Sequence, residues 1–208
     1  MQMLSATVLL TAVVAASALN PISRFGKCKD YSVAKGVSFQ KDLTGVWYIQ
    51  RRPQNPDNGA HTCQAIFSKY VKYPTNFIYY YNQGEPVNRP IQYQFIEESE
   101  SNYRGGITVE DKAITLRWEI LYVNDGVLVS YLCTREESAN PGLDAIYIAT
   151  RVQTPKDSDL AAAVQCAKDA YRKVNNKELV FDKVVQDLKS CEPLEVIETE
   201  DDPLQFKV

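Results

Sequence analysis

The sequence predicts an all-β protein: an eight-stranded antiparallel up-and-down β-barrel with one C-terminal α-helix packed outside it. Two observations lead to this fold class. Between residues 43 and 151, short segments rich in aromatic and β-branched residues alternate with turn residues, which is typical of consecutive β-strands. After residue 155, apolar residues recur at helical spacing instead.

The strands follow one another at a spacing that favours a closed barrel. In the segment 113–122, apolar residues such as Trp118 alternate with polar ones such as Arg117, and this indicates an antiparallel sheet with one wet face. Asn124-Asp125-Gly126 is a strong hairpin turn. The predicted strands are 46–52, 63–71, 76–81, 90–97, 103–109, 113–122, 127–134 and 145–151.

One amphipathic helix is expected after the last strand. Asp157, Ser158 and Asp159 supply capping oxygens and negative charge for its start. Apolar residues at helical spacing continue the pattern to about Asn175. The segment 179–188 fits a strand and a helix equally well.

The two ends of the chain differ from the domain between them. Residues 1–18 contain an apolar run followed by Ala16-Ser17-Ala18, as in a cleaved secretory signal peptide. That run is too short to cross a bilayer, so we expect secretion and no membrane span. Residues 19–191 form the single domain, and 192–208 form an acidic tail.

Composition argues against a nucleic-acid partner, and the motifs that are absent argue against an enzyme. The net charge of −3 and pI near 5.3 do not fit a nucleic-acid partner, which needs clustered Lys and Arg. No Cys/His cluster indicates a metal, and no G-x-S-x-G elbow is present. The one histidine, His61, is expected as an exposed loop residue at the mouth of the second strand; an axial haem ligand is the alternative.

Five cysteines occur, and in a secreted chain four of them are expected to form two disulfides. With one cysteine left over there are 15 pairings, and the spacings alone do not choose among them.

Several motifs together resemble the lipocalin family, in particular its apolipoprotein D-like and arthropod pigment-binding branch, which includes bilin-binding proteins and crustacyanins. Gly45-Val46-Trp47 is similar to the family's G-x-W motif, and Arg151 ends the last strand. The order of the cysteines around the strands and helix also matches. One departure is the turn Val123-Asn124-Asp125-Gly126, which lacks the T-D-Y triplet of many members.

The resemblance implies roles for these residues. Trp47, in the motif that begins with Gly45, would plug the closed end of the barrel, and Arg151 would stack across its face. The implied disulfides are Cys28–Cys133 and Cys63–Cys191. Cys166 would then be unpaired, either as a buried thiol or as an intermolecular link.

A small hydrophobic ligand is the partner that this fold implies. Alternation assigns seven aromatic residues to the barrel lining: Phe67, Tyr79, Tyr93, Phe95, Trp118, Tyr131 and Tyr147. Tyrosines offer flat rings and hydroxyls, which suit a bilin, carotenoid, retinoid or sterol; no cofactor is required, and a bilin or carotenoid would be carried as pigment. The alternatives are a scavenger of amines or lipid mediators and a filled barrel that acts through protein contacts. A homo-oligomer or a receptor is a further partner that family members would suggest.

Overall fold

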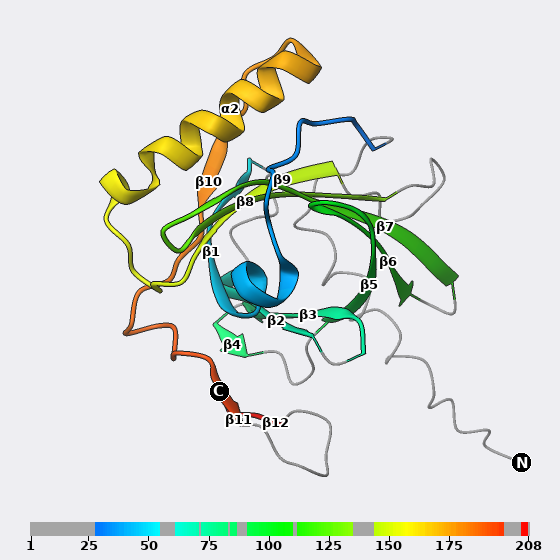
Figure 1. The fold of residues 1–208 in the computed structure, drawn as a ribbon. Coiled ribbons are helices and arrows are strands. Elements are labelled where there is room, and N and C mark those ends of the chain that lie inside the picture. The colour runs from blue at the N-terminus through cyan, green and yellow to red at the C-terminus, as the bar shows by residue number, and fades with distance from the viewer. Residues whose placement is uncertain are drawn as a thin grey trace, which may run out of the picture.

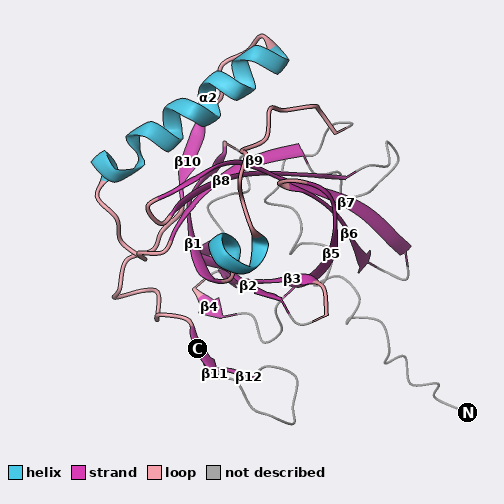
Figure 2. Cartoon of the chain, in the orientation of Figure 1, coloured by secondary structure: helices cyan, strands magenta, loops and turns pink. Residues whose placement is uncertain are grey.

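The structure is a closed β-barrel with a helix lying across its outside (Figures 1 and 2). It is a computed structural model that describes residues 28–54, 61–70, 72–82, 84–86, 91–109, 112–134, 144–197 and 205–207. The proposed signal peptide, residues 1–18, lies outside the described residues.

Eight antiparallel strands make the barrel, as the sequence predicted. They are β1 (Gly45–Pro53), β2 (His61–Tyr70), β3 (Pro74–Asn82), β5 (Ile91–Ser99), β6 (Asn102–Val109), β7 (Lys112–Asn124), β8 (Val127–Thr134) and β9 (Asp144–Thr150). Each pairs with the next along the chain, and β1 pairs with β9 to close the sheet. A short strand, β4 (Glu85–Pro86), pairs with the end of β3.

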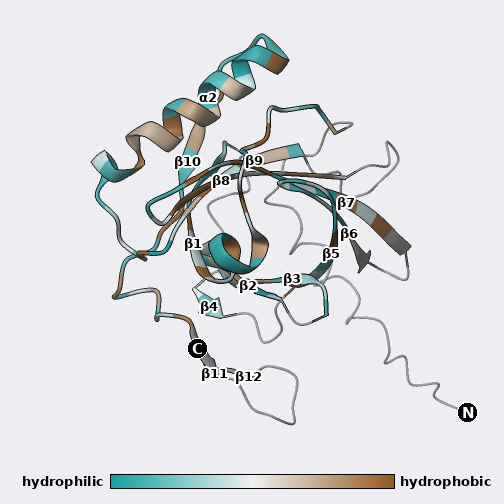
Figure 3. Ribbon diagram, viewed as in Figure 1, coloured by the Kyte–Doolittle hydropathy of each residue, from teal (hydrophilic) through white to brown (hydrophobic). Residues whose placement is uncertain are grey.

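The helix is also where the sequence placed it. A helical turn at Asp157–Leu160 leads into α2 (Ala161–Asn175), which ends at Asn176 in the left-handed conformation. Leu160, Ala163 and Ala167 are buried against the outer face of β8 and β9. Figure 3 shows hydrophobic colour along these two strands beneath the helix, so burial of their outer face explains why the helix docks there.

Two apolar layers result from this arrangement. One fills the barrel interior and includes Trp47, Phe95, Leu116 and Trp118. The other lies between the outer face of β7–β9 and the covering elements, which are α2 and the N-terminal segment around Tyr31. Strands β8 and β9 are therefore buried on both faces.

A single helical turn, Phe39–Leu43, covers the closed end of the barrel (Figure 1). The Trp47 ring behind it is 1% exposed, and its Nε1 donates to the Leu43 carbonyl at 2.7 Å. The Arg151 guanidinium carbon lies 3.6 Å from the centre of the Trp47 ring. The implied plug and the implied stacking contact are both present in the structure.

The C-terminal segment completes the wall between β1 and β2. Strand β10 (Phe181–Lys183) pairs with Arg51–Pro53 of β1. It lies on the same edge of β1 that pairs with β2 earlier in the strand, at Gly45–Tyr48. Beyond it, the amide of Val184 donates to the Gln50 carbonyl, and the amide of Cys63 donates to the Val185 carbonyl. The ambiguous segment 179–188 thus contains a strand. Two further strands, β11 (Glu195–Ile197) and β12 (Gln205–Lys207), pair with each other in the tail.

Both disulfides that the resemblance implied are formed. Cys28 is bonded to Cys133, and Cys63 to Cys191. Cys166 on α2 is a free, half-buried thiol.

Candidate ligand cavity

A cavity lies inside the barrel, between strands that come from all sides of the sheet. It has a volume of about 30 Å³, which is room for one or two water molecules. Its walls are mainly aromatic and aliphatic, with a few polar groups, as is usual for a site that takes small hydrophobic molecules. The lining residues are Ile49, Gln64, Ile66, Asn76, Ile78, Tyr93, Phe95, Trp118, Ser130, Leu132 and Tyr147.

Four of the seven predicted lining residues face this cavity: Tyr93, Phe95, Trp118 and Tyr147. The Phe95 ring lies 5.4 Å from the Trp118 ring and 6.3 Å from the Tyr93 ring, centre to centre. They form a continuous aromatic wall over β5 and β7. Alternation succeeds on these two strands because their outward residues are polar, such as the exposed Gln92 and Gln94 on β5 and the half-buried Arg117 on β7.

The expected inward placement was wrong for Phe67 and Tyr79, which lie on the outer face of the barrel. Ile66 and Ile78 line the cavity, and their chain neighbours point the other way because side chains alternate along a strand. The Phe67 ring stacks on Phe77 at 6.2 Å. Apolar residues occupy both faces here, so the sequence pattern does not show which face is inward.

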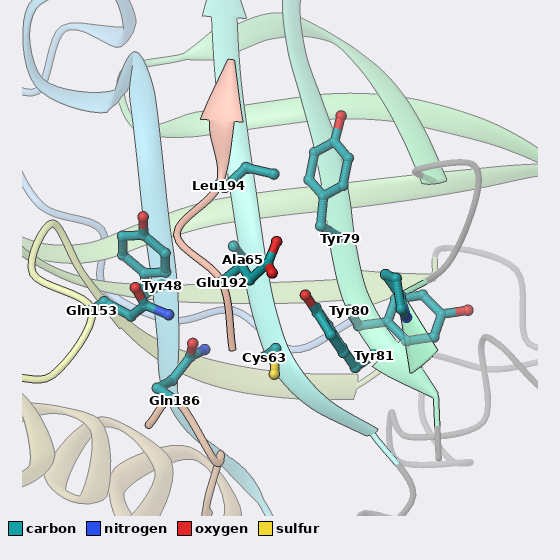
Figure 4. Close-up of a pocket in the computed structure, with 11 residues that line it drawn as sticks. Tyr48, Cys63, Ala65, Tyr79, Tyr80, Tyr81, Gln153, Gln186, Glu192 and Leu194 are labelled. Carbon is teal, nitrogen blue, oxygen red and sulfur yellow. The ribbon is translucent and has the colours of Figure 1, made fainter. Parts of the chain in front are cut away.

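The outward position of Tyr79 can be seen in Figure 4. It belongs to a second, smaller pocket outside the barrel, between β1–β3 and the C-terminal segment, with a volume of about 20 Å³. Tyr48, Gln186 and Leu194 are among the other residues around it.

Tyr131 was also wrongly placed in the lining. Its ring lies in the outer apolar layer, 4.6 Å from the Tyr31 ring. Its hydroxyl donates to the Asp144 carboxylate and accepts from the Lys29 amide, both at 3.0 Å. The N-terminal segment and α2 bury this face of β8, and that burial favours an aromatic residue there just as the interior would.

Sequence reasoning missed the polar residues of the cavity, Gln64, Asn76 and Ser130. Polar residues on a strand were taken to face solvent, but these are 3–6% exposed and face inward. Gln64 alternates with Ile66 and Ser68, and the Ser68 hydroxyl donates to Asn76 Oδ1 on β3 at 2.7 Å. Polar residues opposite each other on neighbouring strands are the signal that would have indicated a polar patch inside.

Three buried oxygen atoms of the cavity have no hydrogen-bond partner within the described part of the chain. They are Gln64 Oε1 and the hydroxyls of Tyr93 and Tyr147. Burial raises the pKa of both phenols, that of Tyr147 most strongly, so both stay protonated at neutral pH. The Arg52 guanidinium lowers the pKa of Tyr147, against the effect of burial, because its positive charge favours the ionised phenol.

Comparison with solved structures shows which fold this is. Insecticyanin from the tobacco hornworm Manduca sexta superposes with a TM-score of 0.61 at 11% identity, over 80% of this chain and 89% of that one. The cockroach major allergen Per a 4 gives 0.58 at 13% identity, over 78% and 97%. An apocrustacyanin gives 0.55 at 18% identity, over 79% and 91%.

These neighbours are lipocalins. This chain has the lipocalin fold. No family model and no curated protein sequence matches it, so the likeness is one of structure.

The structure explains why the first residue of the G-x-W motif is glycine in this barrel. Gly45 has a φ of +96°, and a Cβ there would lie 3.0 Å from an Arg151 guanidinium nitrogen. That guanidinium donates to the carbonyls of Val46 and Asp42, both at 3.0 Å. A side chain at position 45 would displace Arg151 from the Trp47 ring.

His61 differs from its expected environment. It is 6% exposed, and its ring lies 5.1 Å from the Tyr80 ring. The expectation of an exposed loop residue was wrong because β2 begins at His61 itself and the adjoining strand β3 covers it. Its carbonyl accepts from Arg52 at 2.9 Å.

Within the described ranges, no group of three or more His, Cys, Asp or Glu side chains is arranged to hold a metal ion. No helix in that part of the chain has the length and apolarity that a bilayer crossing requires.

Proposed function

We propose that this protein is secreted and carries a small hydrophobic ligand in the barrel cavity. The observation that carries the proposal is the aromatic wall of Tyr93, Phe95 and Trp118 beside an interior space with few polar groups. Such a surface removes apolar area of a ligand from water, which is the main driving force for binding of this kind. Bilins, carotenoids, retinoids and sterols are the ligand classes that fit it best.

Secretion is supported by the apolar leader with its Ala16-Ser17-Ala18 site and by two disulfides that join distant parts of the chain. Disulfides of this kind persist in oxidising compartments.

The small volume of the cavity, about 30 Å³, favours a second candidate. A ring-shaped ligand can enter only if side chains of the wall rotate. A barrel that keeps this packing would act through its outer surface, toward a receptor or another copy, and not as a carrier.

Ligand titration separates the two candidates. The chain has two tryptophans, Trp118 in the cavity wall and Trp47 at the closed end. Adding biliverdin, retinol or a fatty acid to the protein secreted from animal cells should quench the emission of Trp118, and Trp118→Phe should remove most of that quenching. Extraction and mass spectrometry of the purified protein would name a ligand already bound.

Saturable quenching, or a released pigment, supports the carrier. If none of the three ligands changes the emission and nothing is extracted, the filled barrel is the better description.

A further inference from the structure

We propose that the ligand carries a carbonyl-type oxygen, as in a ketone, aldehyde or lactam, which accepts hydrogen bonds from the hydroxyls of Tyr93 and Tyr147. The proposal deepens the carrier function argued above and rests on it. The apolar wall does not specify a polar group on the ligand, and the carbonyl-type oxygen would be that group.

The first support is the state of the two phenols. Tyr93 and Tyr147 are 1% and 6% exposed, and both hydroxyls lie without a hydrogen-bond partner in the described structure. A buried hydroxyl that gives up its water without gaining a partner destabilises the fold. Phenylalanine would fill the same space without that cost, so the hydroxyls are suited to a group that arrives with the ligand.

The second support is their position. Both residues line the same cavity, Tyr93 from β5 and Tyr147 from β9. The cavity has a volume of only about 30 Å³, so one ligand group inside it reaches both side chains. Tyr93 also contributes to the raised pKa of Tyr147. Two neighbouring O–H donors match the two lone pairs of one carbonyl oxygen.

The local charges favour a dipole over a full anion. Arg52, buried at 2% exposure, provides positive charge near Tyr147, which attracts the negative end of a carbonyl group. Asp182 is paired with Arg52 across β1 and β10 and acts on it with opposite charge. Because this carboxylate offsets part of the Arg52 charge, the site suits an uncharged oxygen acceptor.

Two fluorescent probes test the inference. One is 6-propionyl-2-(dimethylamino)naphthalene, a ketone whose emission moves to longer wavelength when its oxygen accepts hydrogen bonds. The other is 2-(dimethylamino)naphthalene, which has the same rings without the carbonyl. Quenching of Trp118 reports the binding of either probe, and the emission of the ketone reports its hydrogen bonds.

The double variant Tyr93→Phe/Tyr147→Phe should bind the ketone about 10-fold more weakly, as expected for two lost neutral hydrogen bonds. Its bound emission should move to shorter wavelength, while the carbonyl-free probe should bind as before. Thermal melting should show no loss of stability, since the removed hydroxyls have no partner to lose.

Tyr103→Phe is the matched control. The Tyr103 hydroxyl is equally buried and equally without a partner in the described residues, but Tyr103 is not among the residues that line the cavity. Its ring packs behind the wall, 5.3 Å from the Trp118 ring and 5.8 Å from the Phe39 ring. This variant should leave the affinity and emission of both probes unchanged.

The outcomes distinguish the two proposals. If both probes bind and the double variant changes neither the affinity nor the emission of the ketone, the carbonyl inference is wrong and the carrier function stands. If the double variant is clearly less stable without ligand, the phenols have partners in the protein and the inference is also wrong. If neither probe quenches Trp118, the carrier function itself fails.

Discussion

The Trp47 indole is held by two contacts, and one of them depends on a glycine nearby. Its Nε1 bonds to the Leu43 carbonyl, Arg151 covers its face, and the absence of a side chain at Gly45 gives Arg151 its place. A guanidinium over an indole contributes about 0.5–2 kcal/mol. Burial lowers the pKa of Arg151 to about 10, which still leaves it charged at physiological pH.

Trp47→Ala should therefore lower the free energy of unfolding by about 3–5 kcal/mol, as large-to-small core substitutions do. The loss is expected because the indole fills the closed end and because the Leu43 carbonyl and Arg151 lose their partner. Chemical denaturation measures it. Tyr73→Ala, at an aromatic residue 43% exposed, is the control and should change stability by less than about 0.5 kcal/mol. Equal midpoints for Trp47→Ala and the parent would refute the plug.

Glu119 is a buried carboxylate outside the cavity, beneath the N-terminal segment. Burial raises its pKa to about 7, although Arg117, with its Nε 3.3 Å from Glu119 Oε1, acts to lower it. Asp30 raises it further. The folded protein thus holds this proton more tightly than the unfolded chain, whose ordinary value is 4.5.

The sign of the pH effect follows from this difference. Below about pH 4.5 Glu119 is protonated in both states and has no effect, whereas between about pH 4.5 and 7 stability falls as pH rises. Above pH 7 the loss amounts to about 3 kcal/mol. Glu119→Gln should be more stable than the parent at pH 8 and equally stable at pH 4, as measured by denaturation at each pH. An unchanged difference between the two variants across this range would contradict the assignment.

At the scale of elements, the segment from β10 to Cys191 closes a seam in the barrel. On one edge, β1 pairs with β2 as far as Tyr48 and with β10 from Arg51 to Pro53. The Gln186 side-chain amide spans the seam, donating to the carbonyls of Ile49 at 3.0 Å and Gln64 at 2.6 Å. Since Ile49 and Gln64 also line the cavity, this segment forms part of the support of the candidate site.

The Cys63–Cys191 disulfide fastens this segment to β2. It joins residues 128 apart in the sequence, so it restricts a long loop of the unfolded chain. Replacing both cysteines by serine should lower the free energy of unfolding by about 2–5 kcal/mol, measured by denaturation. Cys166→Ser removes the free thiol and should stay close to the parent, which separates loss of the cross-link from loss of a cysteine. A double variant as stable as the parent would show that the hydrogen bonds alone hold the segment.

At the scale of the whole molecule, the barrel is closed by strands from opposite ends of the domain. Tyr48 pairs with Thr150 and Ile49 with Ala149, so the interior is complete only when the chain has folded throughout. A ligand held inside would contact the folded state alone. Its binding must then stabilise the fold by mass action.

A ligand that quenches Trp118 should therefore raise the melting temperature with its concentration. At 100 times its dissociation constant the gain is about 2.7 kcal/mol, which differential scanning calorimetry resolves. Quenching without any rise in melting temperature would show that the compound does not bind the folded state in preference to the unfolded chain, which contradicts a ligand held inside the closed barrel.

The sequence by itself determined the strands, their order and the helix. The turns at Asn82 and at Asn124–Gly126, and the change to helical spacing after Pro155, are local features, and local chemistry decides them. Through the resemblance of the chain to a known family, the sequence also placed Trp47 against Arg151 and paired four of the cysteines. On β5 and β7 it assigned the inward face correctly, because the outward face is polar.

Only the tertiary structure decided which face is inward on β2, β3 and β8. Phe67, Tyr79 and Tyr131 are buried by neighbouring elements outside the barrel, and burial favours apolar residues whichever side provides it. Gln64 and Asn76 were missed because a polar residue inside a barrel cannot be told from a solvent-facing one by the linear pattern alone. Local sequence does not reveal contacts between residues more than a hundred positions apart. Gln186 donates to the Gln64 carbonyl, and only the closed fold brings the two together.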